Sequence, residues 1–434
     1  MTNMASKPQP LTTAENTIWN LTGCLFYLGC QWLTTVIVVV LSSDYSNSGA
    51  LAFAMSIGNM FASLALYKIR TYQVSDIFNE HTSGGYVAFR FATIIISCIF
   101  LTLYLIIIAP GSSMVVSTLA FLLFKADETF VDVLYGVDQK YGRMDYIGKS
   151  QILRGFATLV GFTVPLVATD SVVFAIMGMA LLCFVNTIAF DVRHARRLDS
   201  IMPQFAKTDL QKLAKACLLP TIANFCATSI VSVVRQSYGI YAGDQLLGIY
   251  ASIATPAVLI QAGATFLYSP LIGKMATALY AKGMREFKCV FLNVLATIAA
   301  IMVAGTIALS LVADRSLVLI FGKGLAPYTW IFPYVLGGTT SIAILLYIND
   351  ALIILRDNRT QIVINAIALA LAAALSKPCI AAFGMNGVNI AILAAVIPAV
   401  LMGFTKIMLS CKSIPTNSRD SSGSAASSER TAKH

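Results

Sequence analysis

Charged residues are scarce in this chain. Only 12% of its 434 residues are Asp, Glu, Lys or Arg, 57% are hydrophobic, and the mean hydropathy is +0.77. A soluble domain usually carries about 25% charged residues. The apolar residues come in long blocks, many of them near the ~20 residues that a helix needs to cross a bilayer. The composition excludes a soluble enzyme, a secreted disulfide scaffold and a free nucleic-acid binder, and it predicts an all-α polytopic membrane protein.

Residues that carry catalysis or bind metals are also sparse. The nine cysteines are scattered through apolar stretches without a CxxC pair, and the three histidines fall in expected loops or the tail. This pattern supports neither a zinc site nor a disulfide framework. A phosphate-binding GxxxxGK[ST] motif is missing as well, so ATP hydrolysis by that route is excluded. The sequence therefore predicts a protein that is not an enzyme and needs no cofactor or metal.

The apolar blocks predict twelve membrane spans with tight hairpins at Pro110-Gly111 and Thr169-Asp170. The spans are 17–41, 49–67, 86–109, 113–135, 151–169, 171–190, 216–235, 246–268, 289–312, 329–353, 360–376 and 385–410. With the N-terminus inside, only Arg235, Arg315, Lys323 and Lys377 of the 30 basic residues fall in outer gaps. Basic residues concentrate in cytoplasmic loops. We therefore expect both termini in the cytoplasm, and we assign the net charge of +10 to membrane topology rather than to nucleic-acid binding.

The chain divides into two halves of six spans. We expect a cytoplasmic N-terminus over 1–16, a first lobe over 17–190, a cytoplasmic linker over 191–215, a second lobe over 216–410, and a disordered cytoplasmic tail over 411–434. Faint similarity links the halves: Gly49-Ala50-Leu51-Ala52 matches Gly248-Ile249-Tyr250-Ala251, and Asp132-Val133-Leu134 matches Asp350-Ala351-Leu352. Six spans return the chain to the same side, which predicts a parallel repeat with a cavity between the lobes.

The fourth span carries the clearest candidate site. Lys125, Glu128 and Asp132 are spaced i, i+3 and i+7, so they share one helical face. Lys125 lies about 18 Å from the outer end of the helix at 1.5 Å per residue, near the middle of the membrane. Such residues mark substrate or ion pathways by default, although a purely structural Lys125–Glu128 ion pair stays an alternative. We expect Lys125 to bind substrate and Glu128 and Asp132 to couple an ion.

Four further polar residues complete the candidate set. Arg90, Arg154 and Arg235 are predicted to bind an anionic substrate, and snorkelling toward lipid headgroups is the alternative for each. Asp350 is predicted to take part in ion coupling, and a polar helix end beside Arg356 is its alternative.

Several segments together resemble a known family. These are Asn16-Thr17-Ile18-Trp19-Asn20, Tyr72-Gln73-Val74-Ser75-Asp76-Ile77, Tyr86-Val87-Ala88-Phe89-Arg90, Gly136-Val137-Asp138-Gln139-Lys140, Arg143-Met144-Asp145, Ser150-Gln151-Ile152-Leu153-Arg154-Gly155, Leu247-Gly248-Ile249-Tyr250-Ala251 and Ser269-Pro270-Leu271. Their order over residues 15–410 resembles the polysaccharide-export, Wzx-type flippases of the multidrug/oligosaccharidyl-lipid/polysaccharide exporter superfamily.

The resemblance implies two six-helix lobes around a central cavity. It also implies transfer of an undecaprenyl-diphosphate-linked oligosaccharide from the inner to the outer leaflet of a bacterial plasma membrane, by alternating access driven by H⁺ or Na⁺. The cargo would serve surface polysaccharides such as O-antigen, capsule or exopolysaccharide, with a polymerase and glycosyltransferases as partners beside membrane lipids. A basic cavity suits such an anion.

Other classes stay open. A multidrug exporter of the same superfamily would share the fold and move small cations. A major-facilitator carrier also has twelve spans, but 67–85 does not match its usual GxxxD[RK]xG[RK][RK] loop. A membrane glycosyltransferase or ligase would need a larger outer loop than 313–328.

Overall fold

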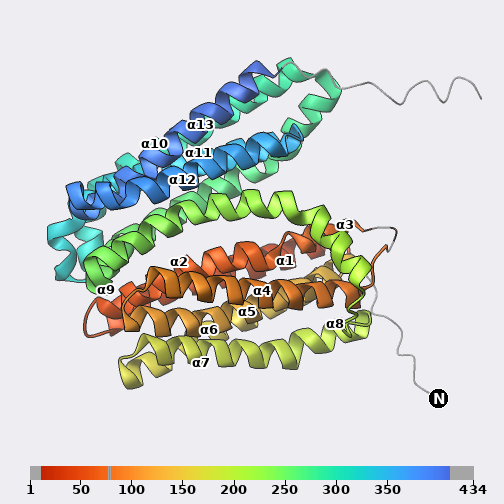
Figure 1. The fold of residues 1–434 in the computed structure, drawn as a ribbon, viewed down its shortest axis with the longest axis horizontal. Helices are drawn as coiled ribbons and strands as arrows, with labels where there is room; N and C mark the ends of the chain where they lie inside the picture. The colour runs from red at the N-terminus through yellow and green to blue at the C-terminus, as the bar shows by residue number, and fades with distance from the viewer. Residues whose placement is uncertain (1–10, 77, 79, 411–434) are drawn as a thin grey trace, which may run out of the picture.

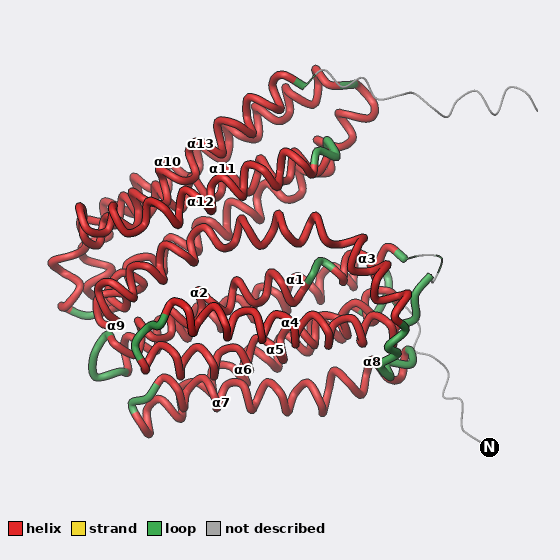
Figure 2. The backbone as a smooth tube through the Cα atoms, in the orientation of Figure 1, coloured by secondary structure: helices red, strands yellow, loops and turns green. Residues whose placement is uncertain are grey.

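Helices joined by short turns make up the described chain (Figure 2). The computed structural model describes residues 11–76, 78 and 80–410, without the side chains of 258–270, 273, 312 and 314. The predicted tail over 411–434, and residues 1–10 of the predicted N-terminal segment, lie outside the described residues. Within these limits the structure contains helices and no strand.

The first half of the chain begins with eight helices and a short π-helical turn. They are α1 (Thr13–Leu41), α2 (Ser46–Leu66), α3 (Ile69–Ser75), α4 (Ser83–Ile108), α5 (Ser112–Lys140), α6 (Met144–Thr169), α7 (Val172–Asn186), the π turn η1 (Thr187–Asp191) and α8 (Val192–Leu198). Thr12 begins α1 with a capping box to Glu15. The predicted hairpins at Pro110-Gly111 and Thr169-Asp170 are confirmed, because α4 ends at Ile108 and α6 at Thr169.

The second half contains longer helices than the sequence predicts. They are α9 (Lys207–Lys282), α10 (Met284–Phe321), the 3₁₀ helix η2 (Lys323–Ile331), α11 (Phe332–Ile354), α12 (Asn358–Phe383), the 3₁₀ turn η3 (Gly384–Asn386) and α13 (Gly387–Leu409). Gly243, with φ 85° and ψ 172°, breaks α9 into two limbs. The predicted linker over 191–215 is largely helical, and only 199–206 stay outside helices. Leu213 explains this extension, because it is buried in an apolar cluster with Tyr86.

The helices have the length and composition of membrane spans. Nine stretches of the described chain are long and apolar enough to cross a bilayer. One of them, 207–257, continues past the break at Gly243, and another, 358–409, contains both α12 and α13. Helix α5 differs from these nine because it contains six charged residues: Lys125, Asp127, Glu128, Asp132, Asp138 and Lys140. The chain is therefore an all-α polytopic membrane protein.

Two helical bundles form the molecule (Figure 1). Helices α1–α8 make the first bundle and α10–α13 lie in the second, while α9 runs along the boundary between them and bends back into the second. The packing repeats: α6 packs on α7 as α12 packs on α13, and α5 packs on α7 as α11 packs on α13. This recurrence agrees with two halves of similar fold.

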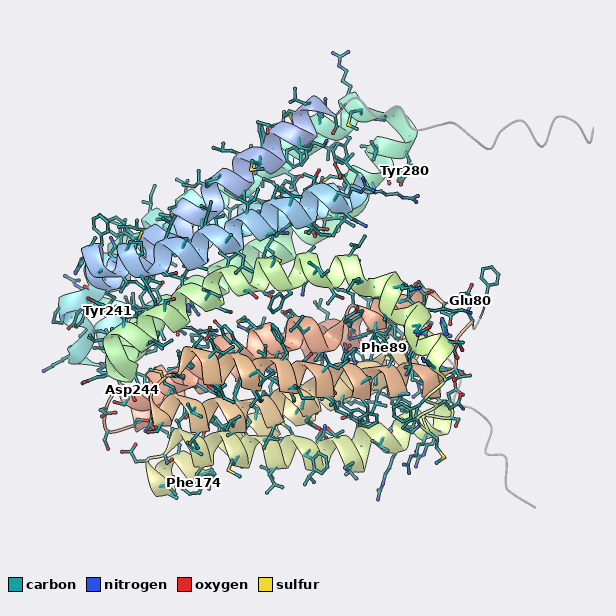
Figure 3. The ribbon with its side chains drawn as sticks, in the orientation of Figure 1. Glu80, Phe89, Phe174, Tyr241, Asp244 and Tyr280 are labelled. Atoms are coloured by element: carbon teal, nitrogen blue, oxygen red, sulfur yellow. The ribbon has the colours of Figure 1, made fainter. Side chains whose placement is uncertain are left out.

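The two ends of the molecule differ in charge and in how the bundles meet. We call the end that holds α3, α8 and the first turn of α1 the basic end, since Arg70, Lys140 and the arginines of α8 lie there. Glu80 and Tyr280 mark this end in Figure 3, where the two bundles diverge. Tyr241 and Asp244 mark the opposite end, where the ribbons of the bundles come together.

A reciprocal glycine contact closes the opposite end. A Cβ atom on Gly49 of α2 would collide with the carbonyl oxygen of Asp244, and one on Gly248 of α9 would collide with that of Tyr45. Gly49 comes four positions after Tyr45, and Gly248 comes four positions after Asp244. Each glycine therefore meets the residue four positions before the other glycine, and the contact has two-fold symmetry. The Tyr45 hydroxyl also donates a hydrogen bond of 2.8 Å to the carbonyl of Phe321. We call this set of contacts the outer junction, after the orientation that the distribution of basic residues predicts.

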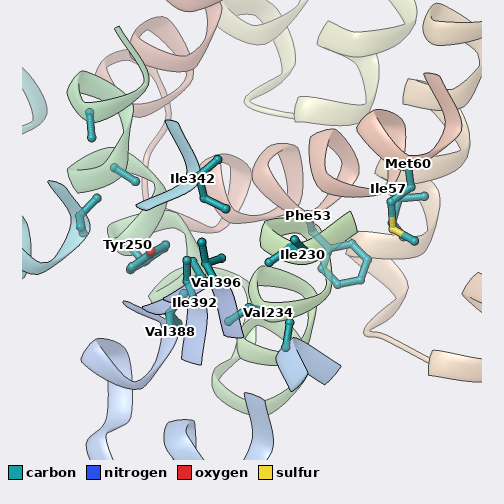
Figure 4. Packing of buried hydrophobic residues seen from close by; sticks show 14 of the residues in the cluster. Phe53, Ile57, Met60, Ile230, Val234, Tyr250, Ile342, Val388, Ile392 and Val396 are labelled. Atoms are coloured by element: carbon teal, nitrogen blue, oxygen red, sulfur yellow. The ribbon is translucent and has the colours of Figure 1, made fainter. Parts of the chain in front are cut away.

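Buried apolar side chains from both bundles pack together beside the outer junction (Figure 4). Phe53 and Ile57 of α2 face Ile230 and Val234 of α9, and all four are fully or almost fully buried. This packing holds α2 against the limb of α9 that precedes Gly243, next to the cavity described below.

A compact polar cluster orders the loop between α3 and α4 at the basic end. The carboxylate of Asp76 accepts hydrogen bonds from the amides of Glu80 and His81, at 2.9 and 3.2 Å, and from the hydroxyl of Tyr86 at 2.9 Å. The ammonium of Lys140 lies 3.9 Å away. Burial tends to raise the pKa of Asp76, but these hydrogen bonds and Lys140 outweigh it and lower the pKa below its ordinary value of 3.8.

Candidate functional site

A cavity of about 180 Å³ lies between the bundles. Helices α1 and α2 form one wall and both limbs of α9 form the other. The lining residues are Leu28, Gln31, Trp32, Thr35, Val38, Ser48, Leu51, Ala52, Met55, Ser56, Asn59, Arg235, Ala251, Ala254 and Thr255. We call it the central cavity. Its lining is mostly apolar with a few convergent polar groups, as in many ligand sites.

Arg235 is the one charged residue that lines the central cavity among the described residues. The helix that carries it continues to the break at Gly243, so Arg235 lies two turns inside the helix rather than at its end, where the sequence analysis expected it. Its guanidinium lies close to the hydroxyl of Tyr250, which donates a hydrogen bond to Asn389 at 2.9 Å. The Nε atom of Arg235 is buried and without a hydrogen-bond partner in the described structure. Arg235 therefore gives the lining of the cavity a positive charge.

Lys125 and Glu128 form an ion pair next to this cavity. The carboxylate of Glu128 also accepts hydrogen bonds from Tyr27 at 2.9 Å and from Gln31 at 3.0 Å, both on α1. Gln31 lines the central cavity and so joins the pair to it. The Lys125 ammonium lies 5.6 Å from the ring centroids of Phe121 and Phe124, and aromatic faces stabilise such a cation.

Asp132 shares the helical face of Glu128 but has different partners. Arg90, which is fully buried, donates to Asp132 at 2.8 Å and also to the carbonyl of Ala65. Arg70 lies 3.4 Å from the same carboxylate and donates to Gln139 at 3.0 Å. This network joins α2, α3, α4 and α5 near the basic end, and Asp132 faces two cations rather than the central cavity.

Arg154 lies in a second buried network. It donates to Asp127 at 2.7 Å and to Thr187 at 2.9 Å, and Thr187 donates to Asp127 at 2.7 Å. Asp127, which lies off the face of Lys125, is thereby tied to α6 and to the π turn η1. Two ions at this depth are stable only when they are paired and hydrogen-bonded. The network fixes helices of the first bundle to one another.

Asp350 lies near the basic end of α11 in the second bundle and is partly exposed. Its neighbour Asn349 is buried and exchanges two hydrogen bonds with Asn365 of α12, at 3.2 and 3.0 Å. Asp350 is not among the residues that line the central cavity. Among the described residues, no group of three His, Cys, Asp or Glu could hold a metal ion.

The structure thus brings Lys125, Glu128 and Arg235 toward one cavity and places Arg90, Asp132, Arg154 and Asp350 elsewhere. Three polar residues around the charged groups, Tyr27, Gln31 and Tyr250, were not predicted from the sequence. Gln31 offered a signal, because an amide in the middle of an apolar span has to face protein or water.

The chain was compared with known proteins. No family model and no curated protein matches it. Solved structures do: an inward-facing multidrug resistance MATE family transporter of the MOP superfamily aligns with a TM-score of 0.68 at 10% identity, over 93% of this chain and 96% of that one. The lipid II flippase MurJ, in an inward closed conformation, aligns with 0.69 at 11% identity, over 90% and 87%. The chain has the fold of MOP superfamily transporters.

A third solved structure also shares the fold. An outward-facing structure of a MATE family transporter aligns with a TM-score of 0.57 at 13% identity, over 91% of this chain and 94% of that one. The inward-facing structure scores higher, at 0.68. In this chain the bundles meet at the opposite end and diverge at the basic end (Figure 3).

Proposed function

We propose that this protein moves an undecaprenyl-diphosphate-linked oligosaccharide from the inner to the outer leaflet of a bacterial plasma membrane. In this proposal twelve spans form two six-helix lobes, the basic end faces the cytoplasm together with both termini, and the cargo passes through the central cavity. The observation that carries the proposal is the charge of that cavity: Arg235 is its one charged lining residue in the described chain, and its Nε is unpaired.

The charge of the cavity distinguishes between cargoes. A diphosphate loses hydration when it leaves water, and a buried guanidinium compensates this loss through charge-assisted hydrogen bonds. A cationic drug would instead meet the like charge of Arg235 without an acidic residue on the described lining. The multidrug exporter remains the second candidate, because the MATE transporter and the flippase align almost equally well with this chain.

The ion pair next to the cavity suggests how cargo and ion are coupled. Lys125 neutralises Glu128 in the present structure. When a diphosphate attracts Lys125, Glu128 loses its cation in a low-dielectric site, and a buried carboxylate then favours its protonated form. Cargo and proton would thereby be linked through one lysine. Asp132 and Asp350 stay in the proposal as weaker coupling candidates, and Arg90 and Arg154 as residues that hold the first lobe in shape.

Transport in proteoliposomes tests the proposal. The full chain is reconstituted with a lipid-linked oligosaccharide and an imposed pH gradient, and glycan exposed in the outer leaflet is measured. We expect Arg235→Gln and Lys125→Gln to reduce transport by about tenfold or more, since hydrogen bonds to a charged group contribute about 1.5–3 kcal/mol each. Lys125→Arg should retain more activity, because the diphosphate requires a cation rather than one shape.

Two controls make the result decisive. Lys377→Gln removes an exposed cation that does not line the cavity, and this variant should transport as the wild type does. Glu128→Gln should still bind cargo but lose its dependence on the pH gradient. Normal transport by Arg235→Gln at normal abundance would refute the anionic cargo, and export of a cationic dye by the wild type would favour the multidrug exporter. Dependence on sodium alone would transfer the coupling role to the region of Asn349 and Asp350.

A further inference from the structure

A second cavity, of about 700 Å³, lies on the first bundle. Helices α4, α5 and α7 form its walls, and α8 with the link after it bounds its basic end. The lining residues are Val87, Phe91, Ile94, Leu123, Ala126, Asp127, Phe130, Met177, Ala180, Leu181, Phe184, Ile188, Val192, Arg196, Ile201, Met202 and Pro203. It shares no lining residue with the central cavity. We call it the lateral groove.

The lateral groove has an apolar body and a cationic end. Its lining contains two charged residues, Asp127 and Arg196. The carboxylate of Asp127 is already engaged by Arg154 and Thr187. Arg196 is exposed and has no ion pair in the described part of the chain. The groove therefore presents hydrocarbon surface along the helices and one free positive charge at the basic end.

We propose that the lateral groove binds one anionic glycerophospholipid, with its acyl chains along α4, α5 and α7 and its phosphate at Arg196. Charge complementarity carries the choice of occupant, because basic pockets between membrane helices on the cytoplasmic side bind anionic headgroups. Exposed apolar side chains at the groove, among them Phe184 at 53% and Met202 at 73% exposure, match acyl chains rather than water. This inference does not rest on the proposed cargo of the central cavity.

The position of the groove gives the lipid a structural role. Ile201, Met202 and Pro203 belong to the link 199–206, which connects the first bundle to α9. The same link is held to the start of α4, where the amide of Gln204 donates to the carbonyl of Gly84 at 3.0 Å. A lipid in the groove extends this attachment, and so it stabilises the link at the point where the first bundle continues into α9.

Native mass spectrometry of the purified full chain tests the proposal, with dioleoyl phosphatidylglycerol and dioleoyl phosphatidylcholine as probes. We expect one phosphatidylglycerol to be retained in preference to phosphatidylcholine. Arg196→Gln should weaken phosphatidylglycerol binding by about fivefold, the contribution of one basic residue near an anionic lipid. The matched control is Arg197→Gln, which removes the same charge from the next position of α8 and does not line the groove.

A second pair of variants tests the apolar body. Ala180→Phe fills the groove and should reduce retention of both lipids, while Ala168→Phe, on the exposed face of α6, should leave it unchanged. Thermal unfolding of each variant verifies that it is folded. Equal retention of the two lipids by the wild type, or equal loss in Arg196→Gln and Arg197→Gln, would overturn the proposal. Preference for an isoprenyl phosphate over phosphatidylglycerol would also overturn it, since the groove would then belong to a carrier lipid.

Discussion

The outer junction allows a sharp test of alternating access. A Cβ atom added at Gly49 or Gly248 would lie less than 3.0 Å from the opposing backbone. Real Cβ atoms essentially never come so close to another heavy atom. The collision is with backbone carbonyl oxygens, which cannot rotate away as a flexible side chain can. The variant Gly49→Ala therefore fits only when α2 and α9 move apart.

The size of the effect follows from packing energetics. Inserting a methyl group into a close-packed contact costs about 1–3 kcal/mol. This cost falls on the state in which the outer junction is closed and is relieved when the junction opens. A difference of about 1–3 kcal/mol changes a conformational equilibrium by roughly 5–150-fold. Gly49→Ala should therefore shift the protein away from the conformation described here.

Spin labels measure this shift directly. Labels at Ala168 and Lys377 of a cysteine-free variant report the distance between the bundles at the opposite end, because both positions are exposed and near helix ends. Pulsed electron paramagnetic resonance in lipid nanodiscs should show a longer distance population in Gly49→Ala that is weak or missing in the labelled parent.

The matched control is Gly337→Ala. Gly337 is also a glycine within a membrane helix, but a Cβ atom there meets nothing within 4 Å. Its distance distribution should equal that of the parent. If Gly49→Ala and Gly337→Ala both give the parental distribution, the outer junction does not control the closed state and the reasoning fails.

Three further predictions concern the first bundle. Arg154→Met should destabilise the protein by about 3–5 kcal/mol in a thermal or denaturant unfolding assay, since it leaves Asp127 buried without its cation. Adding Asp127→Leu to this variant should recover much of the lost stability. A double variant as unstable as Arg154→Met would contradict the pairing. Asp76→Asn should reduce stability by about 1–3 kcal/mol at pH 7. The pKa of Asp76 is lowered in the folded protein, so the stability difference between wild type and Asp76→Asn is lost as the pH falls below 3.8. A stability difference that stays constant down to pH 3 would contradict this pH dependence. Single cysteines at Ser46 and Arg143 test topology with a membrane-impermeant reagent: the first should label from outside and the second should not, and the reverse would invert the predicted orientation.

Much of the fold could be predicted from the sequence because bilayers impose simple rules. Apolar length alone indicates membrane helices, and both hairpin breaks, at Pro110-Gly111 and Thr169-Asp170, were predicted from composition. The faint repeat that pairs Gly49 with Gly248 also had a physical basis, since these two glycines lie in symmetric positions at the outer junction. The sequence could not show that they touch, because their contact joins segments about 200 residues apart.

The candidate site was predictable only in part. Polar residues at membrane depth are visible in a sequence, and this rule found Lys125 and Glu128, whereas Arg235 was predicted at the outer end of its span. Their partners are set by helix packing, which brings Tyr27 and Gln31 of α1 to Glu128 and Tyr250 of α9 to Arg235. For this reason, residues with the same signal in the sequence have different surroundings in the structure: Arg235 lines a cavity, and the fully buried Arg90 pairs with Asp132.

The sequence by itself determined that the chain is a helical membrane protein with charge inside its fourth span, because burying polar groups in lipid is so unfavourable that composition reveals it. Only the tertiary structure decided what each charge does. Asp127 and Glu128 are neighbours in the sequence, yet they point from one helix to different neighbours: Asp127 pairs with Arg154 inside the first bundle, while Glu128 bonds to Tyr27 and Gln31 beside the central cavity. A helix turns by about 100° per residue, so which of the two carboxylates faces the cavity depends on how α5 is rotated against α1 and α6, and that rotation is set by packing between helices.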